Sequence, residues 1–126
     1  MPDKTEWSGN YININADNVC IYGRKGVHVA EDYANPDARI NTVINVSGSM
    51  TVKSTGTYVE SEAIVKERSN VTAGALSLTS GNKSILGPDA QITTAGNFQM
   101  NAAAPNKCTI SSGVVINASS RSGNCL

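Results

Sequence analysis

Apolar positions recur every six or seven residues along almost the whole chain, from Ile14 to Ile116. The steps between them run 7, 6, 6 and keep that order three times before drifting, so the underlying unit is about 19 residues long. Three short strands per unit account for this spacing, whereas an α-helical period of about 3.6 residues does not. The pattern predicts an all-β fold, a single-chain three-sided β-solenoid (β-helix) with about 19 residues per coil and five to six coils.

Stacking the units predicts three columns of inward side chains. Strand side chains alternate between the two faces of a sheet, so the residue two places before each column position is also predicted to point inward. Ile44, Met50 and Leu76 are examples. The first column holds Ile21, Ile40, Val59, Leu78, Phe98 and Ile116, the second Val27, Val46, Val65, Ile85 and Ala104, and the third Ile14, Tyr33, Val52, Val71, Ile92 and Ile110.

The residues between the predicted strands favour tight corners. Segments such as 15–18, 54–56 and 72–74 are rich in Gly, Asn, Asp and Ser where the longer step falls. Gly and Asn accept left-handed backbone angles readily, which a sharp turn needs. The chain is therefore divided into an N-terminal segment that is a candidate cap (1–11), the β-solenoid (12–116) and a C-terminal tail (117–126).

Composition narrows the classes of partner. Charged residues make up 16% of the chain and balance to a net charge of zero, so no basic stripe is available to neutralise phosphates, and we expect no nucleic-acid partner. No stretch approaches the roughly 18 apolar residues of a membrane helix, so no membrane span is expected. The first residues lack the apolar run of a signal peptide, which predicts a cytoplasmic protein by default, with membership of an exported assembly as the alternative.

The three cysteines leave two interpretations open. An odd number of cysteines cannot all be paired within one chain. Cys108 falls on a predicted inward site, where a free thiol behaves as a small apolar group. Either all three are free thiols, or Cys20 or Cys125 forms a disulfide between neighbouring subunits, which requires an oxidising compartment.

Candidate catalytic chemistry is sparse. The one histidine, His28, lies between inward Val27 and Val29, so it is predicted to be exposed, and no two-histidine metal site is available. Glu60 and Glu62 form the best enzyme-like group, beside Lys53, Lys66, Glu67 and Arg68. Because the predicted coils are near minimal length and leave no loops to shape a groove, we interpret that group as a charged solvated wall. We expect no catalytic, metal-binding or cofactor-binding residues, no cofactor, and no enzyme activity.

The two ends of the predicted solenoid are the candidate functional surfaces. A terminal coil presents unpaired backbone groups and apolar column residues, and the tail after Ile116 is too short for a helical cap. The natural partner of one terminal coil is the opposite terminal coil of another copy, a contact that propagates into a filament. The predicted assembly residues are Trp7, Ile12, Ile14 and Val19 at one end and Ile110, Val114 and Ile116 at the other.

The Val and Ile strands, the Gly, Asn and Asp turns and the coil length between Ile12 and Ile116 resemble the bactofilin-type β-helix, a family of bacterial scaffolds that polymerise without nucleotide. The resemblance is one of repeat period. It implies a structural subunit that assembles with itself head-to-tail into a filament or scaffold, with a polysaccharide or another bacterial structural component as a further candidate partner.

Two other resemblances imply alternative functions. Segments 11–16 and 114–118 look like the β-needle of phage or contractile-injection spikes, which implies a trimeric spike or needle-tip component. Filamentous-haemagglutinin adhesins share the coil length, which implies a surface adhesin or a carbohydrate-binding β-helix module.

Overall fold

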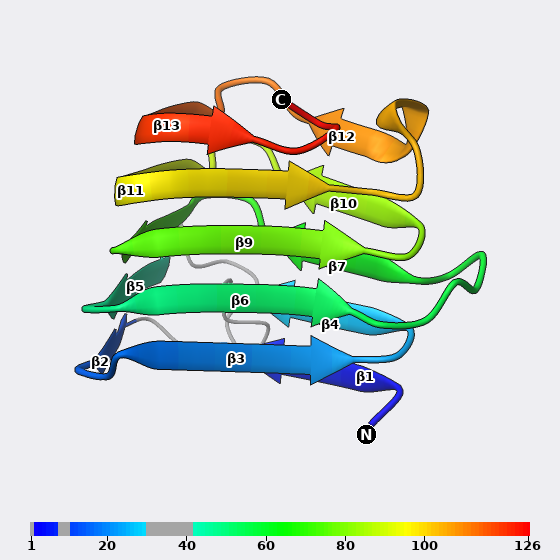
Figure 1. The fold of residues 1–126 in the computed structure, drawn as a ribbon, viewed down its shortest axis with the longest axis horizontal. Helices are drawn as coiled ribbons and strands as arrows, with labels where there is room; N and C mark the ends of the chain where they lie inside the picture. Colours follow the sequence, from blue (N-terminus) through cyan, green and yellow to red (C-terminus); the bar gives the residue numbers. More distant parts are fainter. Residues whose placement is uncertain (1, 8–10, 30–41) are drawn as a thin grey trace.

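The computed structural model describes residues 2–7, 11–29 and 42–126, and they form a stack of short strands (Figure 1). Every strand pair is parallel, and the chain winds through about four turns of a β-solenoid, as predicted. The strands are β1 (Lys4–Trp7), β2 (Tyr11–Ile14), β3 (Asn18–Gly23), β4 (Gly26–Val29), β5 (Thr42–Val46), β6 (Ser49–Ser54), β7 (Glu62–Val65), β8 (Ser69–Ala73), β9 (Ala75–Ser80), β10 (Lys83–Leu86), β11 (Gln91–Asn101), β12 (Cys108–Ile110) and β13 (Val115–Ser122), with a 3₁₀ turn at Pro105–Lys107.

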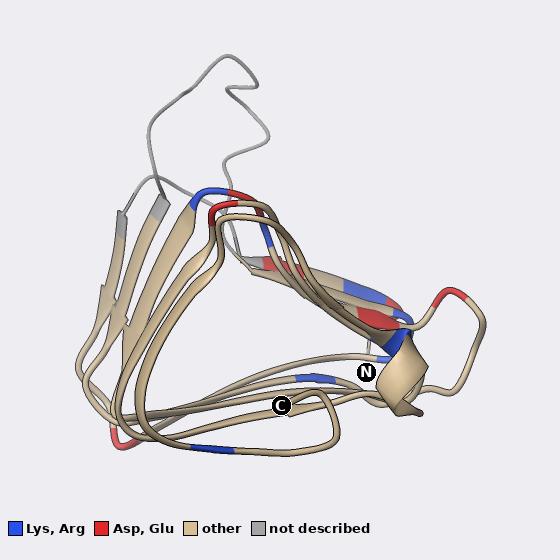
Figure 2. Ribbon diagram, turned by 90° about the horizontal axis from the view of Figure 1, so that it is seen from above, with Lys and Arg blue, Asp and Glu red and all other residues tan. Residues whose placement is uncertain are grey.

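Seen along its axis, the solenoid has a triangular outline with three faces (Figure 2). Face A consists of β1, β4, β7, β10 and β12. Face B1 consists of β2, β5 and β8, and face B2 consists of β3, β6 and β9. The long strands β11 and β13 bend at the corner between B1 and B2, so each contributes its first half to B1 and its second half to B2.

The coils are longer than the predicted 19 residues, and there are fewer of them than the predicted five to six. Val71 pairs with Ile92, 21 residues further on, and Leu76 pairs with Phe98, 22 residues further on. Gly26 pairs with Glu62 across 36 residues, because that coil includes residues 30–41 and a long corner. The sequence pattern counted Val59 as a wall position, but Val59 lies in the corner before β7 and is 79% exposed.

The longer coil also changes the predicted columns. Val71 and Ile92 share a column, as predicted, whereas Leu78 pairs with Met100 and not with the level of Phe98. Tyr33 and Ile40, two other predicted column members, lie outside the described residues. The prediction of which residues point inward was better than the prediction of which residues stack, because alternation is a local property and register depends on corner length.

The core fills the inside of the triangle. Ile44, Met50 and Leu76, which alternation predicted to point inward, are buried, and so are the larger Leu78 and Phe98. Each fully buried side chain of this size contributes about 1.5–3 kcal/mol relative to an exposed one. The alternation of apolar and polar residues along each strand thus produces one continuous apolar interior.

Stacked glycines form the corner between B1 and B2. The backbone N–H of Gly74 donates to the carbonyl oxygen of Gly48 at 2.8 Å, and that of Gly96 donates to Gly74 at 2.7 Å. A Cβ added to Gly74 would lie 3.1 Å from the Gly48 oxygen, which is tighter than ordinary contact. The predicted turn at 72–74 therefore marks a real corner, and close backbone approach explains its glycine.

Candidate functional site

The N-terminal end of the solenoid consists of β1, β2 and β3. Within residues 2–7, 11–29 and 42–126, each of these strands pairs on one side only, with β4, β5 and β6 respectively. Ile12, Ile14 and Val19 lie on this first coil and are half-buried against the core. Trp7 is opposite Val29 in the strand register, and its side chain is not among those described. We call the unpaired side of these strands, in the described part of the chain, the N-terminal edge.

The C-terminal end consists of β12 and β13. Among the described strands, β12 pairs with β10 alone and β13 with β11 alone, which leaves a C-terminal edge. Val114 and Ile116 are half-buried against the core, and Ile110 is 45% exposed on β12. The structure therefore places all the predicted assembly residues in the first and last coils, and their role in assembly stays a prediction.

The two edges match each other along face B1. One inward column runs the length of the rod through successive strand pairs: Ile12, Ile44, Val71, Ile92 and Ile116. Because every pair is parallel, the N-terminal edge offers the same backbone pattern that each interior strand offers to the strand beneath it. A second copy placed on top by translation along the axis would set its Ile12 over Ile116 and continue the column.

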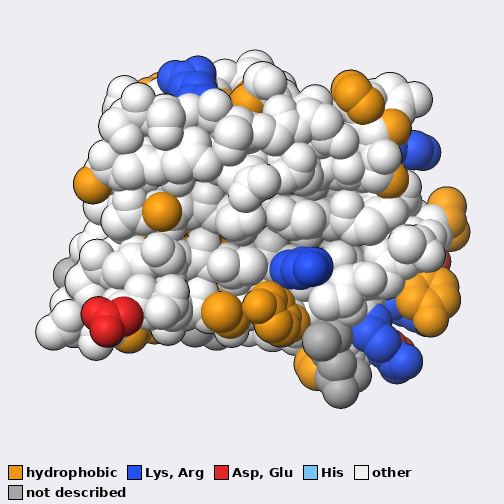
Figure 3. Space-filling model, in the orientation of Figure 1, with side chains coloured by type: hydrophobic (Ala, Val, Ile, Leu, Met, Phe, Trp, Pro, Cys, Tyr) orange, Lys and Arg blue, Asp and Glu red, His pale blue; other side chains and the backbone are white. Residues whose placement is uncertain are grey.

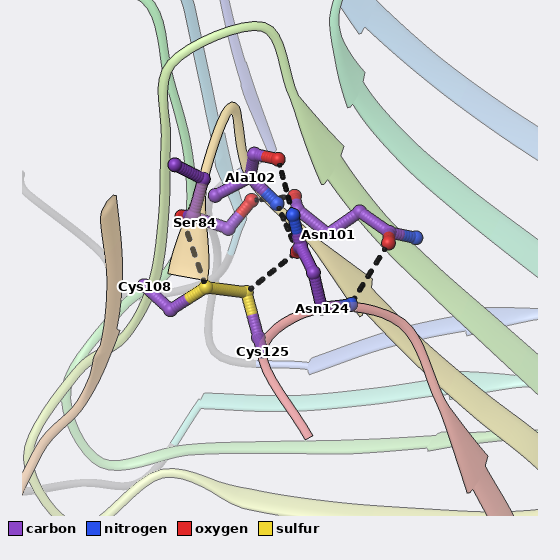
Figure 4. Close-up of a disulfide and its surroundings, with 7 residues drawn as sticks. Ser84, Asn101, Ala102, Cys108, Asn124 and Cys125 are labelled. Atoms are coloured by element: carbon purple, nitrogen blue, oxygen red, sulfur yellow. Dashed lines mark hydrogen bonds between the residues drawn. A yellow bond between two sulfur atoms is a disulfide. The ribbon is translucent and has the colours of Figure 1, made fainter. Parts of the chain in front are cut away.

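A disulfide closes part of the C-terminal end. Cys108 and Cys125 are bonded through their sulfur atoms, with their Cα atoms 5.5 Å apart (Figure 4). The predictions of a free thiol at Cys108 and of an intermolecular bond at Cys125 are therefore wrong, because the chain folds back over the last coil and brings the two together. Cys20 is a free, exposed thiol on β3, and its cross-linking to a neighbour stays a prediction.

Residues 123–126, which we call the strap, are held by more than the disulfide. The Ala102 N–H donates to Asn124 Oδ1 at 2.9 Å, and Asn124 Nδ2 donates to the Ala102 carbonyl at 2.8 Å (Figure 4). The Cys125 N–H donates to the Met100 carbonyl at 3.1 Å. Gly123 has φ +100°, and a Cβ there would lie 2.2 Å from the Met100 oxygen, so glycine is required.

Sequence reasoning missed the strap. It treated an odd cysteine count as evidence against internal pairing, although one pair and one free thiol satisfy the same count. The signal was available in the run Gly123-Asn124-Cys125 directly after the last strand, since Gly and Asn are typical of a chain reversal.

His28 on face A is also placed differently from the prediction. It points away from the core, yet it is only 7% exposed, because Glu6 and Glu62 on the neighbouring strands flank it. Its Nε2 lies 2.9 Å from Glu62 Oε1, and its Nδ1 lies 3.8 Å from Glu6 Oε1. Burial lowers the pKa of His28, the nearby Lys66 lowers it further, and the hydrogen bond to Glu62 acts in the opposite direction.

A cavity of about 270 Å³ opens beside His28 on face A. Lys25 Nζ lies 3.3 Å from Glu60 Oε1 and 5.0 Å from the centre of the Tyr58 ring. The backbone amide of Glu60 and the ammonium of Lys25 lower the pKa of the Glu60 carboxyl. No group of three potential ligands in the described part of the chain could hold a metal ion. The residues that line the cavity are Asp3, Lys4, Lys25, Gly26, His28, Glu60 and Glu62.

Glu60 and Glu62, the group singled out in the sequence, therefore lie together at this cavity, but some of their expected neighbours do not. Lys53 is on β6 of face B2, and Glu67 and Arg68 lie in the corner after β7, where they approach each other at 4.0 Å. The acids at the cavity are paired with Lys25 and His28, an arrangement typical of a surface in which opposite charges compensate each other.

Face B2 has the opposite character. It is almost free of charged side chains over β6, β9 and the second half of β11 (Figure 3). A shallow depression of about 200 Å³ crosses these strands. Its outward lining is made of small or uncharged side chains: Ser49, Thr51, Ala75, Ser77, Asn97 and Gln99.

Comparison with known proteins adds no name: no family model, no curated protein and no solved structure matches the chain. In the part of the chain that is described, no helix has the length and apolar character needed to cross a membrane. The argument for function therefore depends on the geometry of the two ends.

Proposed function

We propose that this protein is a non-enzymatic structural subunit that assembles head-to-tail with copies of itself through the edges of its first and last coils. The observation that carries the proposal is the inward column of face B1, which begins at Ile12 and finishes at Ile116. Stacking one copy on another would continue this column and its parallel hydrogen bonding without any new kind of contact.

The energetics favour such a joint. Ile12, Ile14, Val114 and Ile116 are only half-buried in the single chain, so a second copy would remove more of their apolar surface from water. That burial stabilises by about 25 cal/mol for each Å². Each backbone hydrogen bond made across the joint adds about 0.5–1.5 kcal/mol net. Because the two edges differ, the contact does not close on itself, and it propagates into a filament.

A pair of neighbouring substitutions tests the joint. Ile116→Lys should abolish assembly, because it would bury an unpaired charge between two coils. Val115→Lys is the matched control, since Val115 pairs with exposed Gln91, points outward and is 45% exposed. Assembly should be measured by sedimentation velocity and negative-stain microscopy, in both oxidising and reducing buffer, with circular dichroism to confirm that both variants keep their β structure.

The polarity of the joint has its own test. Ile12→Lys should disable the other end, so neither single variant should form filaments. A mixture of the two variants keeps one intact edge of each kind, and we expect it to form a discrete heterodimer. The proposal is wrong if the wild-type protein stays monomeric in both buffers, or if Ile116→Lys assembles like the wild type. A discrete wild-type trimer would favour the spike alternative.

A further inference from the structure

The strap does not follow the path that the chain takes in lower coils. After β6 and β9 the chain leaves face B2, turns the corner and enters face A as β7 and β10. After β13 it turns over the end of β11, where Asn124 bonds to Ala102 and Cys125 to Met100. Met100 and Ala102 are buried, and Cys125 packs against the core. The C-terminus accordingly lies inside the triangular outline in Figure 2.

This position is one that a stacked copy would need. On face B2 the inward column runs through Ile21, Val52, Leu78 and Met100. A second copy continuing the solenoid would set its own Ile21 above Met100. The strap already lies there, since the ideal Cβ position of Gly123 is 2.2 Å from the Met100 oxygen. Face B1 is thus open for stacking at Ile116, and face B2 is obstructed at Met100.

The disulfide holds the obstruction in place. Cys108 continues the inward column of face A, above Ala63 and Ser84. Its bond to Cys125 therefore ties the strap across the interior from face B2 to face A. Without that bond, four residues would be held by a few hydrogen bonds, and such short terminal segments fray readily.

We propose that the Cys108–Cys125 disulfide is a redox-controlled cap on the C-terminal edge, closed when oxidised and open when reduced. A dithiol reductant opens it: two electrons and two protons pass to Cys108 and Cys125, the sulfur–sulfur bond breaks, two thiols form, and the reductant becomes a disulfide. Reducing compartments would then permit head-to-tail stacking, and oxidising compartments would keep the subunits apart. This inference rests on the head-to-tail function proposed above.

The experiment compares oxidised and reduced full-length protein at the same concentration, before and after treatment with dithiothreitol. We expect the oxidised wild type to sediment as a monomer and the reduced protein to form filaments. Cys125→Ser should assemble in either buffer. Cys20→Ser is the matched control, and it should keep the full redox dependence, which separates the cap from cross-linking at the exposed thiol.

A second measurement follows the cap without relying on assembly. Amide hydrogen exchange at Ala102 and Cys125, whose N–H groups are bonded at the strap, should accelerate on reduction of an Ile116→Lys monomer that cannot stack. Unchanged exchange overturns the cap. Equal assembly of oxidised and reduced wild type overturns the cap and leaves the joint standing, whereas the absence of assembly in every state, Cys125→Ser included, overturns both.

Discussion

The first and last coils of this solenoid present matching backbone edges but are secured in different ways. The first coil is linked to the coils above it by charged side chains on face A, where His28 on β4 lies between Glu6 on β1 and Glu62 on β7. The last coil is secured by a covalent strap that crosses the interior. The difference teaches that matching edges do not make equivalent ends: one end has its interior open to a partner, and the other has it covered.

Loss of the disulfide should produce the largest effect on stability. Cys108→Ser removes a covalent link that closes a loop of 17 residues, and it should lower the free energy of unfolding by about 3 kcal/mol. Urea denaturation of an assembly-blocked background measures this directly. Cys20→Ser should leave the midpoint nearly unchanged, and an equal loss in both variants would contradict a special role for the last coil.

Loss of the Asn124 side chain should have the next largest effect. Asn124→Ala leaves the N–H and C=O of Ala102 without the partners that now satisfy them, which should cost about 2 kcal/mol. The exposed Asn117 on β13 provides the comparison, because Asn117→Ala should change the thermal midpoint very little. A result in which the two alanine variants melt together would show that hydrogen bonds at the strap contribute nothing.

Acid should weaken the first coil by the smallest amount. Burial lowers the pKa of His28, so below the ordinary value of about 6.5 the unfolded chain takes up a proton that the folded chain refuses. Stability contributed by the neutral imidazole is complete above that value and falls as the pH drops through the folded pKa. Thermal midpoints between pH 7.5 and 5.5 should decline less steeply in His28→Gln than in the wild type. Parallel slopes would contradict this assignment.

Local sequence pattern predicted much of the fold. Alternation identified the buried Ile44, Met50 and Leu76, and glycine-rich turns such as 72–74 fall at true corners. The coil length was underestimated because the corner before β7 contains an apolar residue, Val59, that the count took for a wall position. An apolar side chain in a long corner is indistinguishable in sequence from one on a strand, so the register could not follow from periodicity.

The candidate site was predicted unevenly. Ile12 and Ile116 were placed correctly in the terminal coils, because the ends of a periodic pattern are visible in the sequence. The pairing of Cys108 with Cys125 and the burial of His28 were missed. Both depend on residues from other coils: His28 is covered by Glu6 and Glu62, which lie 22 and 34 positions away.

The sequence by itself determined that this chain is a β-solenoid, because side-chain alternation and turn chemistry act within a few residues and repeat along the whole length. Only the tertiary structure decided which residues stack, which histidine is buried and which end is closed. Those properties depend on how many residues each corner takes up, and a difference of two or three residues there moves every later strand to a new neighbour. The strap over Met100 is the clearest case, since it exists only where the last coil meets the one beneath it.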